Sequence, residues 1–176
     1  MKKFSYILVV GFIIAAVNVN PQKLIAQKYA SKVVCSLIGG MNNKNSNVDL
    51  ALKEPNNSSK NKKSYDVSLG GGFIILDMGV NIVDSNGPDL VVHESGASYT
   101  GASSEPFYVK GSSDMKPGSW VFLGEYSGDK TTIDLKNFGA NNIRYIAIFD
   151  MTYKPNDNSE TPGADIDAVV ALNYKK

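Results

Sequence analysis

The chain has 176 residues, a formal net charge of +1 and a single cysteine. This length is enough for one domain with its own core, and one cysteine excludes a framework of intramolecular disulfides. Residues 46–176 hold 12 of the 18 basic residues and all 17 acidic residues, a balance of −5. An acidic domain argues against nucleic acid as a partner and is compatible with bound cations.

The N-terminus has the pattern of an export signal. Lys2 and Lys3 precede an apolar run over residues 6–17, which is shorter than the roughly 20 residues of a bilayer-spanning helix. No pair of small residues marks a clear cleavage site. We therefore assign residues 1–27 to a signal peptide or an uncleaved anchor, which would be the chain's one membrane contact. The rest of the protein is expected to be secreted or held at the cell envelope.

Residues 28–47 are predicted to be a low-complexity linker. Cys35 lies in this segment and follows a valine, where a lipoprotein would have a small residue, so we expect it to be a small buried hydrophobe. The stretch 41–64 is rich in Asn, Lys and Ser and cannot bury enough apolar area to offset ordering, which favours a loop. The apolar island at 48–52 is predicted to be an edge strand or turn that begins a domain over residues 48–176.

After residue 64, eight short apolar or alternating segments recur between turn residues, with no amphipathic helix between them. This spacing predicts an all-β fold, an antiparallel β-sandwich or barrel. Residues 142–149 are apolar on both alternating sets, as in a central strand, and residues 131–135 are half polar, as at an edge. The eight segments are 65–69, 72–78, 89–95, 106–112, 119–126, 131–135, 142–149 and 166–174.

Two further patterns make predictions about packing. Gly70–Gly72 lead into a strand and no Lys-Ser/Thr follows, so they indicate a close backbone approach or a bulge and not a phosphate loop. Trp120, Phe122 and Tyr126 share one alternating set of a strand. We therefore expect all three aromatic residues to face the core.

Acidic residues gather near the ends of several predicted strands. Asp150 closes one strand while Asp165 and Asp167 open the next, and the turn that carries Asp84 and Asp89 opens another. If the strand after Asp89 runs antiparallel beside 142–149, these five carboxylates converge, and they repel each other unless a cation or proton intervenes. Calcium takes roughly six to eight oxygen ligands, so we predict a calcium site there. The alternative is a set of hydrogen-bonded turn caps or exposed charges.

Five segments in this order resemble bacterial cell-surface domains that have a discoidin-like, galactose-binding-like jelly roll. Asn56 replaces an aspartate, His93 replaces a phenylalanine, and residues 115–117 interrupt the usual pattern before Trp120. The resemblance implies a jelly-roll sandwich and no particular substrate, because such folds host many functions. The segments are ALKEPNN, VSLGGGFIILDMGVNIVDSNGPDLVVHES, EPFYVKGSSDMKPGSWVFLGEY, IRYIAIFDM and GADIDAVVALN.

The sequence predicts a binding protein and not an enzyme. His93 is the only histidine, which excludes a multi-histidine zinc site, and no G-x-S-x-G motif is present. We expect a module that recognises glycans or another envelope component. Sugars stack on exposed aromatic rings, so Tyr99 and Tyr153, in or near predicted loops, are the candidate contacts, with packed loop anchors as the alternative. The competing interpretation is a calcium-stiffened structural or protein-interaction domain without a small-molecule ligand.

Overall fold

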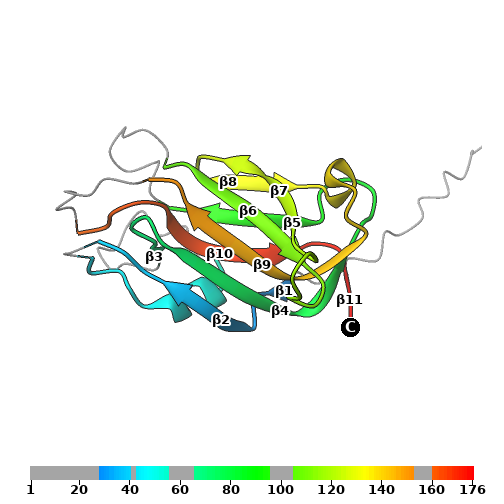
Figure 1. The fold of residues 1–176 in the computed structure, drawn as a ribbon, viewed down its shortest axis with the longest axis horizontal. Coiled ribbons are helices and arrows are strands. Elements are labelled where there is room, and N and C mark those ends of the chain that lie inside the picture. Colours follow the sequence, from blue (N-terminus) through cyan, green and yellow to red (C-terminus); the bar gives the residue numbers. More distant parts are fainter. Residues whose placement is uncertain (1–27, 41–42, 56–65, 96–104, 153–159) are drawn as a thin grey trace, which may run out of the picture.

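Two antiparallel β-sheets pack face to face in the computed structural model of this chain (Figure 1). The structure describes residues 28–40, 43–55, 66–95, 105–152 and 160–176. Apolar side chains from both sheets, with short 3₁₀ helices η1 (Val48–Leu52) and η2 (Leu135–Phe138), enclose one main core. The predicted antiparallel sandwich is confirmed. Fully buried side chains in this core include Leu69, Ile74, Leu76, Leu90, Phe107, Leu123, Ile146, Ile148 and Ile166.

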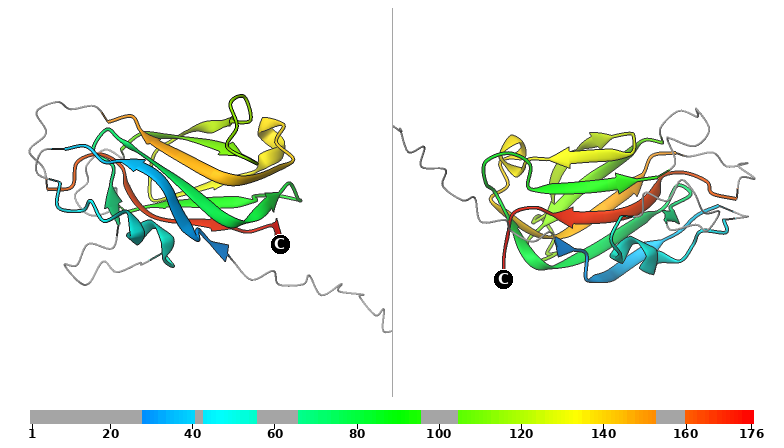
Figure 2. Two further views of the ribbon diagram at one scale, coloured as in Figure 1. Left: turned by 60° about the horizontal axis from the view of Figure 1, so that its bottom comes forward. Right: turned by 180° about the vertical axis from the view of Figure 1, so that it is seen from behind.

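The first sheet is built around one strand that is buried along its whole length. That strand, β10 (Asp165–Ala171), pairs with β5 (Leu90–Glu94), which in turn pairs with the edge strand β8 (Lys130–Ile133). On its other side β10 pairs with two short strands, β1 (Lys28–Tyr29) and β3 (Val67–Ser68). Figure 2 shows β8, β5 and β10 side by side from behind.

The second sheet has its longest strand, β4 (Phe73–Val83), beside the central strand β9 (Asn142–Asp150). β6 (Phe107–Ser112) follows β9, and β7 (Val121–Tyr126) forms the edge. On its outer side β4 pairs with β2 (Lys32–Leu37) and, further along, with β11 (Tyr174–Lys175).

Strand positions agree with the sequence, whereas two neighbour relations do not follow from it. All eight predicted segments overlap a strand, with β9 central and β8 at an edge as expected, although β4 continues to Val83, five residues beyond its predicted end. However, β5 lies beside β10 in the first sheet and not beside β9, because the chain crosses between the sheets after β4. Sequence spacing locates the strands approximately, whereas the neighbour of each strand depends on this crossover between the sheets.

The N-terminal boundary of the sandwich also differs from the prediction. β1 and β2 both lie within the predicted linker, residues 28–47, and each pairs with a sheet strand. Their backbone hydrogen bonds hold them, although most β2 side chains are exposed. Cys35 is among the exposed residues, so the prediction that it is buried is wrong. Residues 1–27 lie outside the described residues. Among the described residues no helix is long and apolar enough to cross a membrane.

The glycine cluster at 70–72 lets two backbones touch, which confirms the predicted close approach. A Cβ atom on Gly72 would lie 1.8 Å from the carbonyl oxygen of Leu37, and one on Gly70 would lie 2.4 Å from that of Gly39. Gly70 also has φ +60°, a conformation that side chains disfavour. These glycines therefore bring the end of β2 against the start of β4.

We predict that Gly72→Ala lowers the free energy of unfolding by about 2–3 kcal/mol, because the new methyl group overlaps backbone and not a movable side chain. Gly87→Ala is the control, since Gly87 has φ +84° but no atom lies within 4 Å of the place that its new methyl group would take. It should cost about 1 kcal/mol. Urea unfolding of both variants provides the comparison, and equal losses would contradict the close-approach explanation.

Candidate functional site

The register of β10 with β5 places the predicted acidic residues at two ends of the sandwich. Ala171 pairs with Leu90, and the Leu172 amide donates to the Asp89 carbonyl at 2.8 Å. At the other end, the Ser95 amide donates to the Asp165 carbonyl at 2.9 Å. The length of a seven-residue strand, roughly 20 Å, separates the two places.

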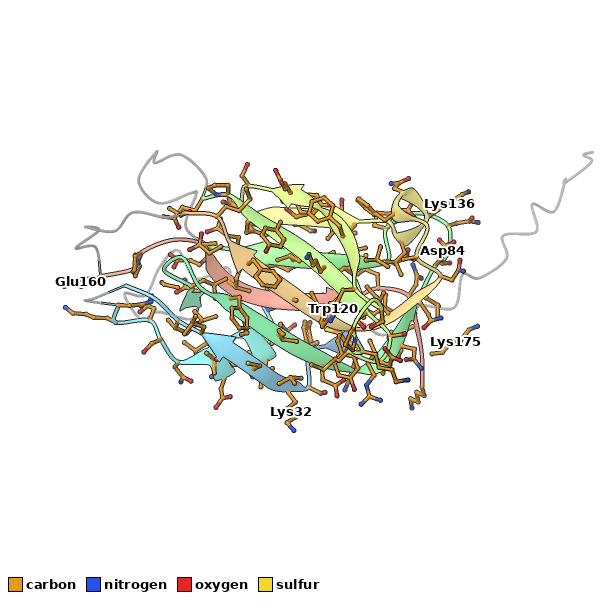
Figure 3. All side chains as sticks on the ribbon, in the orientation of Figure 1. Lys32, Asp84, Trp120, Lys136, Glu160 and Lys175 are labelled. Atoms are coloured by element: carbon orange, nitrogen blue, oxygen red, sulfur yellow. The ribbon has the colours of Figure 1, made fainter. Side chains whose placement is uncertain are left out.

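The five carboxylates predicted to form one site therefore do not meet. Asp84 and Asp89 lie where β10 ends, and Asp165 lies where it begins. Asp150 lies with Asp165, since a Cβ on Gly163 would touch its carboxylate. Asp167, buried within β10, is two residues from Asp165. Figure 3 shows the separation through its labelled residues, with Asp84 at one end of the molecule and Glu160, which precedes β10, at the other.

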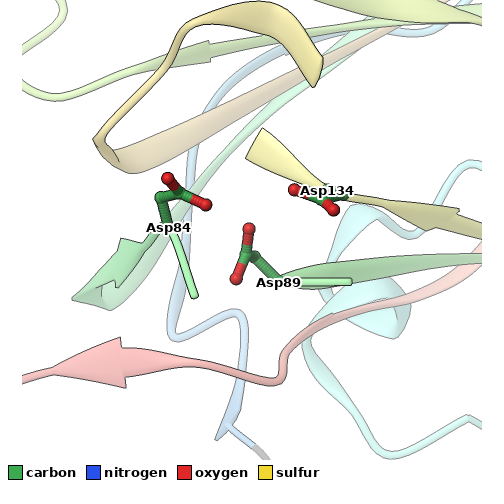
Figure 4. A group of neighbouring side chains, drawn as sticks. All are labelled: Asp84, Asp89 and Asp134. Atoms are coloured by element: carbon green, nitrogen blue, oxygen red, sulfur yellow. The ribbon is translucent and has the colours of Figure 1, made fainter. Parts of the chain in front are cut away.

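A different acidic cluster forms at the Asp84 end. Asp84 follows β4, Asp89 precedes β5, and Asp134 lies between β8 and η2. One carboxylate oxygen from each lies within 4.8 Å of the others (Figure 4). The sequence does not predict that Asp134 belongs to this cluster. The spacing identifies β8, which Asp134 follows, as an edge strand but does not show which strand lies beside it. The pairing of β8 with β5 is what brings Asp134 beside Asp89.

Asp89 is the buried centre of this cluster and is already held by hydrogen bonds. Its Oδ1 accepts from the Ser85 amide and from Asn173 Nδ2, both at 3.1 Å, and its Oδ2 accepts from the Leu135 amide at 2.9 Å. Asp134 caps η2 by accepting from the Lys136 amide at 3.0 Å. Both residues thus serve as turn or helix caps, which was the alternative interpretation of the acidic residues.

The electrostatics of the cluster favour a positive charge. Burial raises the pKa of Asp89 above its ordinary value, and the nearby Asp134 charge raises it further, while the hydrogen bond from Leu135 opposes both effects. Asp84 is exposed to solvent. Asp89 Oδ1 already accepts two hydrogen bonds, whereas its Oδ2 accepts one and keeps a lone pair for a cation. The three residues could therefore hold a metal ion, which would offset the cost of burying Asp89.

At the Asp165 end of the sandwich, a proton and not a cation reduces the repulsion between carboxylates. Asp165 is buried and accepts a hydrogen bond from Ser68 Oγ, and its amide donates to Glu94 Oε1 at 3.3 Å. Burial raises the pKa of Asp165 to about 8, against the Ser68 hydrogen bond, and the charges of Asp66, Glu105 and Glu94 add to the rise. At neutral pH a proton on Asp165 therefore removes one negative charge from this end.

Asp150 has a structural partner set at this end. Its Oδ2 accepts from the Gly71 amide at 2.6 Å and its Oδ1 accepts from the Thr152 amide at 2.7 Å. Both carboxylate oxygens therefore tie the glycine turn before β4 to the end of β9. This arrangement matches a turn cap, the alternative that the sequence left open for the acidic residues.

We predict that the fold becomes less stable as pH rises, because Asp165 must lose the proton that its buried position favours. Between the unfolded pKa near 4 and the folded value of about 8, the folded state holds a proton that the unfolded state has lost. The free energy of unfolding should fall by up to about 1.4 kcal/mol per pH unit in this window. Urea unfolding from pH 4.5 to 8.5 should show a flatter profile for Asp165→Asn, and an unchanged one for the exposed Asp129→Asn. A wild-type profile without this slope would contradict the assignment.

A row of aromatic side chains crosses the outer face of the second sheet. Tyr108 on β6 stacks on Phe149 of β9, with centroids 4.6 Å apart and planes at 11°. Phe73 on β4 lies 5.5 Å from the Phe149 ring, and Phe122 on β7 lies 6.2 Å from the Tyr108 ring. We call Phe73, Phe149, Tyr108 and Phe122 the aromatic row. Leu37 on β2, which is 63% exposed and pairs with Phe73, extends it.

Phe122 corrects one packing prediction. Instead of facing the core it is 48% exposed, while Leu123 is buried in its place. The register of β6 with β7 shifts between Tyr108 and Lys110, and Gly124 has φ +113°, so the strict alternation along β7 is broken. The alternation in β6 predicts the outward position of Tyr108, because Phe107 and Val109 on either side of it face the core.

Lys110 is the charged residue at the centre of this face. Its Nζ lies 5.7 Å from the centroid of Tyr108 and 5.9 Å from that of Phe149, within range of a cation–π interaction with both. Across the strand pair it faces Phe122. The arrangement combines apolar ring faces with a polar, charged group, which is how aromatic binding surfaces orient polar ligands.

The structure does not test the two predicted sugar contacts. Tyr99 and Tyr153 lie outside the described residues. His93 lies on β5 opposite Lys130, in the other sheet, and burial and the Lys130 charge lower its pKa. It is therefore uncharged at neutral pH.

No family model matches the chain, and no curated protein matches it. Solved structures with a similar fold are CBM32 modules and related bacterial domains. A putative chitobiase fragment from Bacteroides thetaiotaomicron has a TM-score of 0.49 and 15% identity over 82% of this chain and 90% of that one. The CBM32 of AlyQ in complex with 4,5-unsaturated mannuronic acid has 0.44 and 15%, over 81% and 96%. The GH31 CBM32-2 bound to GalNAc has 0.43 and 10%, over 83% and 99%.

The identities of these three neighbours are 15% or lower, and their TM-scores are all below 0.5. The chain spans 34% of a truncated AlyQ that holds both CBM32 and alginate lyase domains. Such a likeness assigns no role to any residue of this chain. The roles of the residues described above therefore rest on the geometry of this chain.

Proposed function

We propose that this domain is an exported, non-catalytic binding module for glycans and that the aromatic row is its sugar-stacking surface. The observation that carries the proposal is a continuous row of aromatic rings across four neighbouring strands, in which Phe122 is exposed and the other three rings are half-buried. A pyranose ring has an apolar face that packs on an aromatic ring and hydroxyl groups that need polar partners. At the usual strand spacing the row extends over roughly 14 Å, which suits a chain of sugars and not a single terminal residue.

Two features of the sequence support the same function. The ordered motifs resemble cell-surface domains, and the N-terminal pattern of lysines and an apolar run suits export. Glycans of the cell surface or surroundings are the ligands that an extracytoplasmic module meets. Tyr99 and Tyr153 remain proposed contacts at the loops.

One observation favours a second candidate, a protein-interaction domain. The aromatic row lies on an open sheet face and continues into exposed Leu37 at the edge strand β2. Contiguous apolar patches of this kind are typical of protein contacts as well. The ligand is then an envelope protein, and the same face would bind it without any sugar.

We predict that Tyr108→Ala and Phe122→Ala each weaken glycan binding at least about fivefold, because loss of a stacked ring costs about 1 kcal/mol. The measurement is a glycan array followed by calorimetry with the strongest ligand. Val34→Ala is the matched control, since Val34 is an exposed apolar residue outside the row. It should bind like the wild type.

The outcomes separate the two candidates. Glycan binding that both ring variants leave intact would remove the aromatic row from the function. An array without any bound glycan, together with an envelope protein whose binding requires Tyr108 and Phe122, would establish the protein-interaction domain instead.

We also propose that calcium occupies the cluster of Asp84, Asp89 and Asp134. Three carboxylates within 4.8 Å offer the hard oxygen ligands that calcium prefers, with backbone carbonyls and water to complete the shell. An ion there would join the β4–β5 turn to the start of η2, which Asp89 already links through its hydrogen bonds. Its role would be structural.

We predict that calcium raises the free energy of unfolding by about 2.7 kcal/mol at a hundredfold excess over its dissociation constant. Thermal melts with calcium and with chelator provide the measurement. Asp84→Asn and Asp134→Asn should each remove most of the difference. Asp165→Asn, at the opposite end, should keep it. Identical wild-type melts in both conditions would leave the three aspartates as caps and exposed charge.

A further inference from the structure

Lys110 lies beside the aromatic row, and the stacking of neutral sugars does not require its charge. Its ammonium group lies over Tyr108 and Phe149, which form the most closely stacked ring pair of the row. A lysine in this position can cover apolar rings with its aliphatic stem, which would make its role structural. The charge of Lys110 indicates a role in ligand binding as well.

The charge of Lys110 has no carboxylate partner in the part of the chain that the structure describes. The ion pairs there join Lys44 to Glu160, Lys116 to Asp114, and Arg144 to Asp77. Arg144 lies on the same sheet and is neutralised by two hydrogen bonds to Asp77, at 2.8 and 2.9 Å. Lys110 is thus a cation of this face without an ion pair among the described residues, and its ammonium group lies beside two aromatic rings.

The surroundings of Lys110 make this cation selective for negative charge. Residues 46–176 carry a balance of −5, and adding Lys28, Lys32 and Lys44 of the segment that holds β1 and β2 gives −2 for residues 28–176, so an anionic ligand meets a net negative domain and gains from a local positive group. Apolar rings beside the ammonium lower the effective dielectric constant, which strengthens its attraction for an anion. Glu125 is exposed and pairs with Tyr108 across the strands, so this sheet also carries a negative charge near the rings.

We propose that the aromatic row binds acidic glycans and that Lys110 contacts the carboxylate or sulfate of a sugar whose ring stacks on Tyr108 or Phe149. This inference rests on the proposed glycan-binding function and specifies its ligand class. The stacked ring fixes the position of the sugar, and the ammonium group pairs with its anion at the ring edge. Neutral sugars would keep the stacking and lose the ion pair.

The test compares oligogalacturonate with the same oligosaccharide after reduction of its carboxyl groups, and dextran sulfate with dextran. Wild-type protein should bind each acidic form roughly tenfold more tightly than its neutral counterpart, with a preference that weakens at high salt. Lys110→Gln keeps much of the length of the side chain and should abolish the preference. Lys110→Arg should retain it, and Lys136→Gln, an exposed lysine on η2, should leave it unchanged.

The outcomes distinguish this inference from the function on which it rests. Equal affinity for acidic and neutral forms, lost on Tyr108→Ala, would overturn the acidic preference and leave a glycan-binding module. A preference that survives Lys110→Gln would overturn the role of Lys110. Absence of binding to these probes and to every glycan on the array would overturn the proposed function and this inference together. A purely structural role would change the melting temperature of Lys110→Gln without changing the ratio of the two affinities.

Discussion

The pairing of β10 with its neighbours is the constraint on which the rest of the structure depends. All seven residues of this strand are buried, and it pairs with β5 along one side and with β1 and β3 along the other. A one-residue slip would turn every side chain of β10 to the other face, so its register is strongly specified by the core. The same register places Asp89 at one end of the sandwich and Asp165 at the other.

The two acidic ends show two physical solutions to the burial of carboxylates. At the β10 start, a high pKa keeps a proton on Asp165, which reduces the repulsion from neighbouring acidic groups. At the β10 end, Asp89 is held by backbone and amide donors, and Asp84 and Asp134 lie near enough to share a cation with it. One end is therefore expected to respond to pH, and the other could hold a metal ion. Both anchor loops that join the two sheets.

The proposed function belongs to a flat face and not to an acidic rim. The outer surface of the second sheet presents aromatic rings from four strands, and Lys110 adds a charge that its own chain leaves uncompensated among the described residues. The loops at both ends of the sandwich hold the two sheets together. The paired strands of the second sheet set the spacing of the aromatic rings. Because the rings stand on paired strands, their geometry is set by backbone hydrogen bonds, which makes the surface preorganised for a ligand.

The sequence by itself determined the strand segments, the all-β class and the glycine contact at 70–72, because each depends on local alternation or on the space that a missing side chain leaves. The sequence also predicts the outward position of Tyr108, because apolar core residues stand on either side of it. Tertiary structure alone decided which strands are neighbours, and so that Asp134 and not Asp165 lies with Asp89. It likewise decided that Phe122 faces outward, since the register shift in the β6–β7 pair breaks the alternation along β7. The physical reason is that pairing and crossovers are long-range choices, fixed by the packing of the whole core and not by the spacing of residues along the chain.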